Sequence, residues 1–398
     1  MKKIVLSAIA TMTLGTVAAN AIDLYQDANG QVFTSKAEGR TLVKDKSVSV
    51  HGKADKFKFS GQTFIGYKST SFKNDNVTPA TTRASTQGFE IRRGYFQLKA
   101  YLLDDPKSYY RVTFDLKNST AVDGNSLVVR AKYAYLNLNE VLPATSLEIG
   151  LAHRPWHDYE EHNSWLYRSI SEVLIENKNS AHLSSSADYG VMAKTRTKFL
   201  DADIGIFNGE GYHGVQNADG MSLEWRFTGH LLGTAGHPDK NTYLDASFFG
   251  QLNQKHDTAT VQGTVENDDL KFYGLHTVFN MPAFLVSGQY VTSANTASAV
   301  NNVSKGAGNG YSFNAEGRLG SEHQYKAFAK YDNWTPDAPT GTATNTRRTY
   351  IAGAAWKMNK NVEWVANITQ NSNDNNAYAS KAVTANSTAY MLTTEINF

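Results

Sequence analysis

The chain has 398 residues, and its composition excludes several classes of protein. It contains no cysteine, which excludes a disulfide framework, a cysteine-ligated zinc site and covalently attached haem. Its formal charge of +2 gives no sign of a nucleic-acid partner, and we expect none.

The N-terminus carries the features of an export signal. Residues 1–3 are Met-Lys-Lys, residues 4–18 are apolar or small, and residues 19–21 form a small-x-small cleavage pattern. This arrangement predicts a signal peptide over residues 1–21. An N-terminal membrane anchor is the weaker alternative, because the apolar core is short and Asp23 follows at once.

Residues 22–55 differ in pattern from the rest of the chain. A short hairpin is expected to turn at Asn29-Gly30, a dipeptide favoured in two-residue β-turns. A lysine-rich run over residues 44–58 then leads into the first long strand. We interpret 22–55 as a periplasmic N-terminal arm, with a disordered leader as the alternative.

From residue 56 to the C-terminus, apolar and polar residues alternate in about sixteen segments, each near the length of a tilted strand that crosses a bilayer. A clear example is the set Tyr110, Val112, Phe114 and Leu116. The mean hydropathy is only −0.44, as expected when alternate residues alone face lipid. We therefore predict an all-β fold, a transmembrane antiparallel β-barrel of about 16 strands over residues 56–398.

The expected connections alternate between long and short, which is typical of barrels with long extracellular loops and short periplasmic turns. The long connections are 69–87, 118–126, 154–186, 209–219, 253–268, 293–309, 333–346 and 371–387. The short ones lie near 104–107, 139–145, 197–200, 233–240, 280–282, 320–322 and 358–361.

The last strand places Tyr390, Leu392, Ile396 and Phe398 on one face and ends at the phenylalanine. It resembles the closing strand of a Gram-negative outer-membrane β-barrel. The resemblance implies a protein of the cell outer membrane, in contact with outer-membrane lipid and lipopolysaccharide.

The long connection 154–186 follows the fifth expected strand and combines aromatic with charged residues. In this it is similar to the third loop of general porins, which folds inward and narrows the pore. We predict a constriction, whose candidate residues are Arg154, His157, Asp158, Glu160, Glu161, His162 and Arg168. A loop on the solvent-exposed surface is the alternative.

The histidines and glutamates of this connection do not predict a metal site. His153, His157 and His162 lack a zinc-binding spacing with Glu160 or Glu161. We expect no metal and no cofactor.

The expected strand register turns a set of charged side chains inward, because a Lys or Arg facing lipid at mid-membrane costs ~2–4 kcal/mol. The predicted pore-lining residues are Arg92, Arg111, Asp115, Arg130, Lys132, Lys194, Arg196, Arg226, Arg318, Lys326 and Lys330. They could form a basic lumen that attracts anions, or pair to brace the wall, as Arg111 with Asp115 or Arg226 with Glu224 would. The acids of 154–186 oppose the basic set, so the sequence leaves the selectivity open. Strict alternation would send Arg93 to lipid, so we expect a bulge near Gly94.

Several short segments resemble the phosphate-selective porins of the O and P type, in the order of that family. They are Phe-Glu-Ile-Arg-Arg-Gly-Tyr-Phe at 89–96, Tyr-Arg-Val-Thr-Phe-Asp at 110–115, Ala-Tyr-Leu at 134–136, Leu-Glu-Ile-Gly at 147–150, Asp-Tyr-Gly-Val at 188–191 and Gly-Ile-Phe-Asn-Gly-Glu-Gly at 205–211. The resemblance covers roughly residues 57–230. It implies a sixteen-stranded homotrimeric channel for passive diffusion of small hydrophilic solutes or anions.

Two other classes of function were weighed against a channel. An enzyme built on a barrel would need an activated nucleophile, and no nucleophile motif is present, so we expect no enzymatic activity. A surface adhesin, or a barrel that sheathes an electron-transfer cytochrome, would fit long loops, but the sequence shows no repeat or haem motif.

Overall fold

The computed structural model describes residues 25–27, 32–33, 37–42, 56–73, 84–101, 105–119, 126–212, 220–261, 264–295, 307–337, 346–374 and 386–398. The chain divides into two compact units, 1–55 and 56–398. The predicted signal peptide, residues 1–21, lies outside the described residues.

The first unit contains a small antiparallel sheet in the order β2-β1-β3. Its strands are β1 (Tyr25–Gln26), β2 (Val32–Phe33) and β3 (Thr41–Leu42). Tyr25 pairs with Phe33, as the expected hairpin requires, and its other side pairs with Leu42 of β3. The periplasmic location of this unit stays a prediction.

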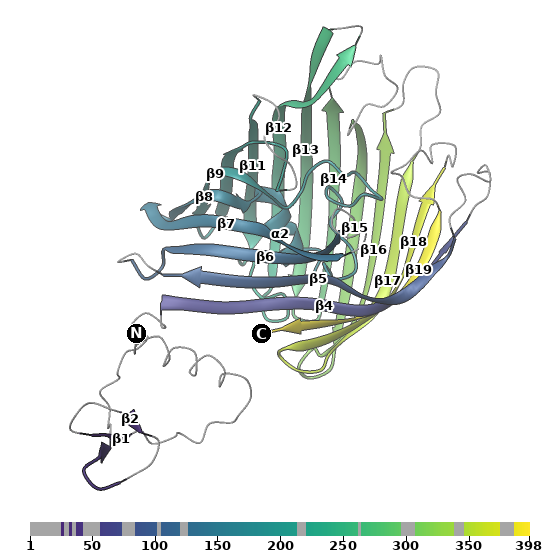
Figure 1. Cartoon of the computed structure of the whole chain (residues 1–398). Helices are drawn as coiled ribbons and strands as arrows, with labels where there is room; N and C mark the ends of the chain where they lie inside the picture. Colours follow the sequence, from purple (N-terminus) through teal and green to yellow (C-terminus); the bar gives the residue numbers. More distant parts are fainter. Residues whose placement is uncertain are drawn as a thin grey trace. The chain divides into compact units, whose positions relative to one another are not determined.

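The second unit is a closed barrel of sixteen antiparallel strands, β4 to β19, which confirms the predicted fold (Figure 1). The strands are β4 (Phe57–Phe72), β5 (Thr86–Ala100), β6 (Tyr109–Ser119), β7 (Ser126–Leu142), β8 (Thr145–His153), β9 (Ala187–Arg196), β10 (Leu200–Phe207), β11 (Ser222–Leu232), β12 (Tyr243–Val261), β13 (Thr264–Met281), β14 (Phe284–Asn295), β15 (Gly308–Leu319), β16 (Tyr325–Pro336), β17 (Arg347–Lys357), β18 (Val362–Asn373) and β19 (Ser387–Asn397). Each pairs with its neighbours in sequence, and β19 pairs with β4 to close the barrel.

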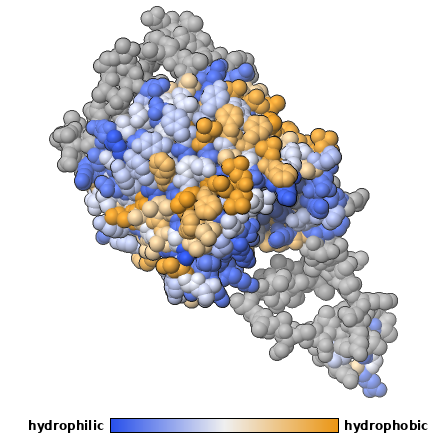
Figure 2. All heavy atoms as spheres, turned by 180° about the vertical axis from the view of Figure 1, so that it is seen from behind, coloured by the Kyte–Doolittle hydropathy of each residue, from blue (hydrophilic) through white to orange (hydrophobic). Residues whose placement is uncertain are grey.

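Alternation along the strands separates an apolar outer face from a polar inner face. On β6, Tyr110 and Phe114 are exposed outward, whereas Asp115 is fully buried on the inside. Apolar side chains gather over the outer surface in Figure 2. An apolar exterior with every strand paired is the form of sheet that hydrocarbon tolerates, since no backbone group is left without a partner.

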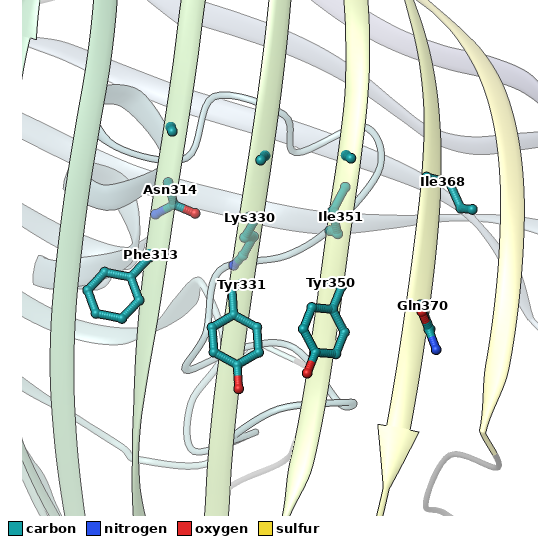
Figure 3. Close-up of a pocket in the computed structure, with 11 residues that line it drawn as sticks. Phe313, Asn314, Lys330, Tyr331, Tyr350, Ile351, Ile368 and Gln370 are labelled. Atoms are coloured by element: carbon teal, nitrogen blue, oxygen red, sulfur yellow. The ribbon is translucent and has the colours of Figure 1, made fainter.

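The outer face of β15 to β18 has a shallow groove where the outward side chains are small. Its floor is formed by Ala315, Ala329 and Ala352, and it encloses about 450 Å³. Figure 3 shows Tyr331 and Tyr350 side by side at its rim. Their stacked rings have centroids 4.8 Å apart.

One predicted connection is wrong. Residues 253–268 were expected to form a long loop, but β12 and β13 continue their pairing to Val261 and Thr264, so that only 262–263 lie between the strands. The physical reason is visible in the sequence: residues 258–265 are rich in Thr and Val, which favour extended pairing.

The bulge expected near Gly94 is present, with Arg92 as the extra residue. Phe64 pairs with Arg93, and the next residue, Ile65, pairs with Ile91. Arg92 and Arg93 therefore both turn inward, where Arg93 Nε lies 3.1 Å from Asp115 Oδ1. A similar bulge on β7 makes Lys132 the extra residue, because Thr113 pairs with Tyr133 and Phe114 with Ala131.

Barrel closure extends to the last residue of the chain. The backbone N–H of Gly61 donates to the Phe398 carbonyl at 2.8 Å, and the Phe398 N–H donates back to Gly61 at 3.1 Å. The Phe398 ring also lies 6.0 Å from the Phe96 ring, centroid to centroid. Glycine at position 61 makes room for this arrangement, since a Cβ there would lie 2.3 Å from the Phe398 ring and 2.7 Å from the Tyr95 carbonyl oxygen.

We predict that Phe398→Ala lowers the free energy of unfolding by about 1 kcal/mol, the value typical of one aromatic pair, because the contact with Phe96 is lost. Urea titration in detergent micelles measures this. Phe398→Tyr keeps the ring and should unfold at the wild-type urea concentration. An unchanged midpoint for Phe398→Ala would show that the ring contributes nothing to closure.

Candidate functional site: the lumen and segment 154–186

Segment 154–186 lies inside the barrel and crosses its lumen (Figure 1). It leaves β8, the fifth barrel strand, and forms helix α2 (Pro155–Asn163) before returning to β9. Its hydroxyl groups donate hydrogen bonds to inward-facing carboxylates on strands that are far apart in the barrel. The bonds are Tyr159 Oη to Asp245 of β12 (2.7 Å), Ser169 Oγ to Glu395 of β19 (2.5 Å) and Ser180 Oγ to Asp332 of β16 (3.1 Å).

The start of α2 is set by its first residues. Pro155 suits the first helical turn because its φ is already helical, and Asp158 in that turn complements the positive end of the helix dipole. Arg154 precedes the helix without capping it. Its buried guanidinium instead lies 2.6 Å from Glu224 and 3.4 Å from Asp188, which fixes the root of the segment to the wall. Among the residues that the structure describes, no helix is long and apolar enough to cross a membrane.

Aromatic stacking holds the segment against the wall. The Trp156 ring stacks on Phe249 of β12 with centroids 3.7 Å apart and planes 2° from parallel. The Tyr167 ring stacks on Phe328 of β16 at 3.8 Å. All four side chains are buried. This packing rules out the alternative of a loop on the solvent-exposed surface.

The predicted constriction residues divide into buried anchors and open charges. Arg154, His157 and Glu160 are buried. Arg168 bonds to Glu161 at 2.7 Å and also pairs with Glu176, so it braces the segment internally. Of these seven side chains, that of His162 is largely open to water, at 72% exposure, and that of Asp158 is partly open, at 36%.

Burial controls the protonation of two anchors. It raises the pKa of Glu160 to about 7, while the Trp156 indole still donates to Glu160 Oε2 at 2.7 Å. Burial lowers the pKa of His157 to about 3, so that this imidazole is neutral at pH 7. Near pH 7, His157 is therefore neutral and Glu160 is partly protonated.

The strands β5 to β9 form a basic wall. We give this name to Arg92, Arg93, Arg111, Arg130, Lys132, Lys194 and Arg196. Their charges are balanced in part by acids on the same wall: Arg130 Nη2 lies 2.9 Å from Asp115, and Lys194 Nζ lies 3.1 Å from Glu148. The Arg130 and Arg196 side chains remain 26% and 41% exposed.

The other predicted pore-lining residues lie outside the basic wall, and most are enclosed by partners. The Arg226, Arg318 and Lys330 side chains are at most 2% exposed. Their ion pairs are Arg226–Asp203 (2.6 Å), Arg318–Glu316 (2.5 Å), Lys330–Asp332 (3.0 Å) and, with less burial, Lys326–Glu363 (2.8 Å). These residues brace the barrel wall.

The two pairs expected within single strands are wrong. Arg226 pairs with Asp203 of the neighbouring strand rather than with Glu224. Asp115 pairs with Arg93 and Arg130 rather than with Arg111. Arg226 and Arg130 lie directly opposite Asp203 and Asp115 on neighbouring strands, about 5 Å away and closer than residues i and i+2 of one strand. Pairs within one strand occur elsewhere, as Arg318–Glu316 and Lys330–Asp332 show.

Several inward charges were missing from the expected set, notably Arg93, Asp203 and Asp245. Arg93 was left out of the set although the bulge expected near Gly94 already turned it away from lipid. Asp201 and Asp203 alternate with Ala202 and Ile204, a period-two signal that could have placed both acids inside. Asp245 likewise alternates with Leu244 and is fully buried, where it accepts from Tyr159.

The histidines of this region show no metal-binding arrangement. Within the described part of the chain, no group of three or more His, Asp or Glu side chains is placed to hold a metal ion. Two of these histidines contact the same carboxylate, with His153 Nε2 3.7 Å and His162 Nδ1 3.5 Å from Asp158 Oδ1. Lys194 Nζ lies 4.0 Å from Asp158 Oδ2.

We predict that Glu160 makes stability fall as the pH rises. Its pKa in the fold is about 7 against an ordinary 4.5, so stabilisation by the protonated form is complete below pH 4.5 and lost as the pH rises through 7. The loss is on the order of 3 kcal/mol. Glu160→Gln should unfold in urea with a smaller dependence on pH over this range. Parallel pH profiles for the two proteins would contradict the assignment.

No family model matches the chain, and no curated protein matches it in sequence. Solved structures do match in fold. The outer-membrane protein OmpT of Vibrio cholerae is 12% identical, with 86% of this chain and 97% of that chain covered and a TM-score of 0.55. An anion-selective porin from Comamonas acidovorans is 13% identical, covering 86% and 99%, with a TM-score of 0.59.

OprB of Pseudomonas putida is 9% identical over 86% of this chain and 95% of that chain, with a TM-score of 0.57. At such low identities the likeness concerns architecture. The chain forms a sixteen-stranded closed barrel whose fold matches those of these three proteins.

Proposed function

We propose that this protein is a porin of the Gram-negative outer membrane, a water-filled channel for passive diffusion of small hydrophilic solutes. The observation that carries the proposal is segment 154–186, which lies in the lumen while leaving charged groups on both sides open to water. The chain would be exported by cleavage after residue 21. It would act as a channel and not as an enzyme.

The size of the barrel supports a water-filled path. About eight strands enclose only side chains, whereas sixteen leave room for an aqueous lumen. Segment 154–186 fills part of that space against β11 to β19. Exposed charges remain on the opposite side at Arg130 and Arg196, and on α2 at Asp158 and His162. Water must reach these side chains inside the barrel, so we place the solute path between α2 and the basic wall.

We further propose that the channel prefers anions. On the basic wall the Arg130 and Arg196 side chains are open to water, whereas their acidic partners Asp115 and Asp203 are 0% and 4% exposed. The cationic ends are therefore what a permeating ion meets. The resemblance of the sequence segments described above to phosphate-selective porins of the O and P type supports the same proposal. That one solved barrel of the same fold is described as an anion-selective porin is consistent with this preference.

Charge removal tests the preference. We predict that Arg130→Ala and Arg196→Ala each lower the chloride-to-potassium permeability ratio about five-fold, since a unit charge at ~8 Å in water attracts chloride and repels potassium by ~0.5 kcal/mol each. The ratio follows from the reversal potential across a planar bilayer under a KCl gradient. Arg348→Ala is the matched control, because Arg348 lies on the outer face of β17 beside Tyr350. Purified wild-type protein that gives no conductance would refute the channel, and unchanged ratios in both variants would refute the anion preference.

We also propose a homotrimer set in outer-membrane lipid and lipopolysaccharide. A related fold, OmpT of Vibrio cholerae, is described in a trimer form, with 12% identity and a TM-score of 0.54. Light scattering of the detergent-extracted protein should give a protein mass three times that of one mature chain. A mass of one chain at all detergent concentrations would exclude the trimer.

A further inference from the structure

Segment 154–186 has three exposed basic side chains, Lys178, His182 and His162, and of these His162 alone belongs to helix α2. It belongs to the last turn of α2, and its side chain is 72% exposed. The Arg154 and Arg168 side chains are 2% and 12% exposed. Since the segment lies within the barrel, the water that reaches His162 is lumen water.

The position of the imidazole is fixed by Asp158, one helical turn earlier. His162 Nδ1 lies 2.6 Å from the Asp158 carbonyl oxygen and 3.5 Å from its Oδ1. The same carboxylate faces the barrel wall, with His153 Nε2 at 3.7 Å and Lys194 Nζ at 4.0 Å. His162 is therefore held at the border between α2 and the basic wall, where we place the solute path.

The charged groups around His162 come from three directions. Asp158 and Glu161 share its helix, Arg111 approaches from β6, and His153 and Lys194 lie behind Asp158 on β8 and β9. Asp158, followed by Glu161, raises the pKa of His162 above the ordinary 6.5, although burial and Arg111 oppose this. Asp158 itself stays ionised, because neighbouring cations hold its pKa well below the usual range. Arg and Lys keep their charge at neutral pH.

Resting on the proposed channel function, we propose that His162 is a selectivity-determining residue of the lumen. Its imidazolium adds positive charge to the solute path in acid and strengthens the preference for anions. Its neutral form in base leaves Asp158 balanced only by cations of the basic wall such as Lys194, and this weakens the preference. Anion preference thus falls as the pH rises, with a midpoint above 6.5.

The test is the reversal potential of single proteins in a planar bilayer under a KCl gradient, from about pH 5 to 9, the range in which imidazoles titrate. Wild type should lose anion preference as the pH rises, and His162→Gln should abolish this change. His237→Gln, in an exposed turn between β11 and β12, should retain it. A pH-dependent change that survives in His162→Gln overturns the proposal. If that change disappears only in His153→Gln, it belongs to the buried imidazole on β8.

A second measurement uses the absence of cysteine from the chain, so that His162→Cys is a unique thiol. A trimethylammonium thiosulfonate reagent should restore anion preference at every pH, and a sulfonate reagent should reduce it. Channels that conduct but respond to neither reagent would overturn the role of His162 and leave the porin intact. The absence of any wild-type conductance would instead overturn the proposed function, and the role of His162 with it.

Discussion

Barrel closure is the constraint on which the rest of the structure depends. Hydrocarbon offers no hydrogen bonds, so each N–H and C=O of a spanning strand must find a partner on a neighbouring strand. The pairing of β19 with β4 removes the two edges that an open sheet would leave. The glycine at position 61 allows this pairing to run to the end of the chain, because the Phe398 ring occupies the space of its missing side chain.

Closure also determines what the interior must do. Because the side chains that face outward are mostly apolar, most charged residues of the strands point inside. There they pair with one another, either across neighbouring strands, as Arg226 does with Asp203, or within one strand, as Arg318 does with Glu316. Separating the two members of a buried ion pair would leave an uncompensated charge, which is costly. These contacts therefore hold the strands of the wall in fixed positions. The rigid wall is the surface against which Trp156 and Tyr167 stack, and this stacking keeps a long connection within the lumen.

Features with a local cause could be predicted from the sequence, and features with a distant cause could not. The alternation of Tyr110, Arg111 and Val112 fixes both faces of β6 by itself, and the same rule gave the architecture and the number of strands. Helix α2 was not expected. It has nine residues, too few to be stable alone, and it depends on the contact of Trp156 with Phe249, 93 positions later in the chain.

Partner choice among the lumen charges was beyond the sequence for the same reason. Whether Asp115 meets Arg111 or Arg130 depends on the register between β6 and β7, which the Lys132 bulge shifts by one residue. The long β12–β13 hairpin was missed because its strands continue through residues 253–268, which were interpreted as a connection. The sequence could not show that Asp158 and His162 are more exposed to water than Arg154 and Arg168, because their exposure depends on how the whole segment packs.

The bulges at Arg92 and Lys132 have a consequence for how the chain can change over evolutionary time. Loss of one residue from a regular strand reverses every side chain beyond it and turns charges towards lipid. Loss of Arg92 would instead restore simple alternation, with Ile91 outward, Arg93 inward and Gly94 outward. The same holds for Lys132 between Ala131 and Tyr133. These two positions are therefore where a strand of this barrel can lose a codon and remain in register, and homologous genes should differ in length there by single residues more often than elsewhere in the strands.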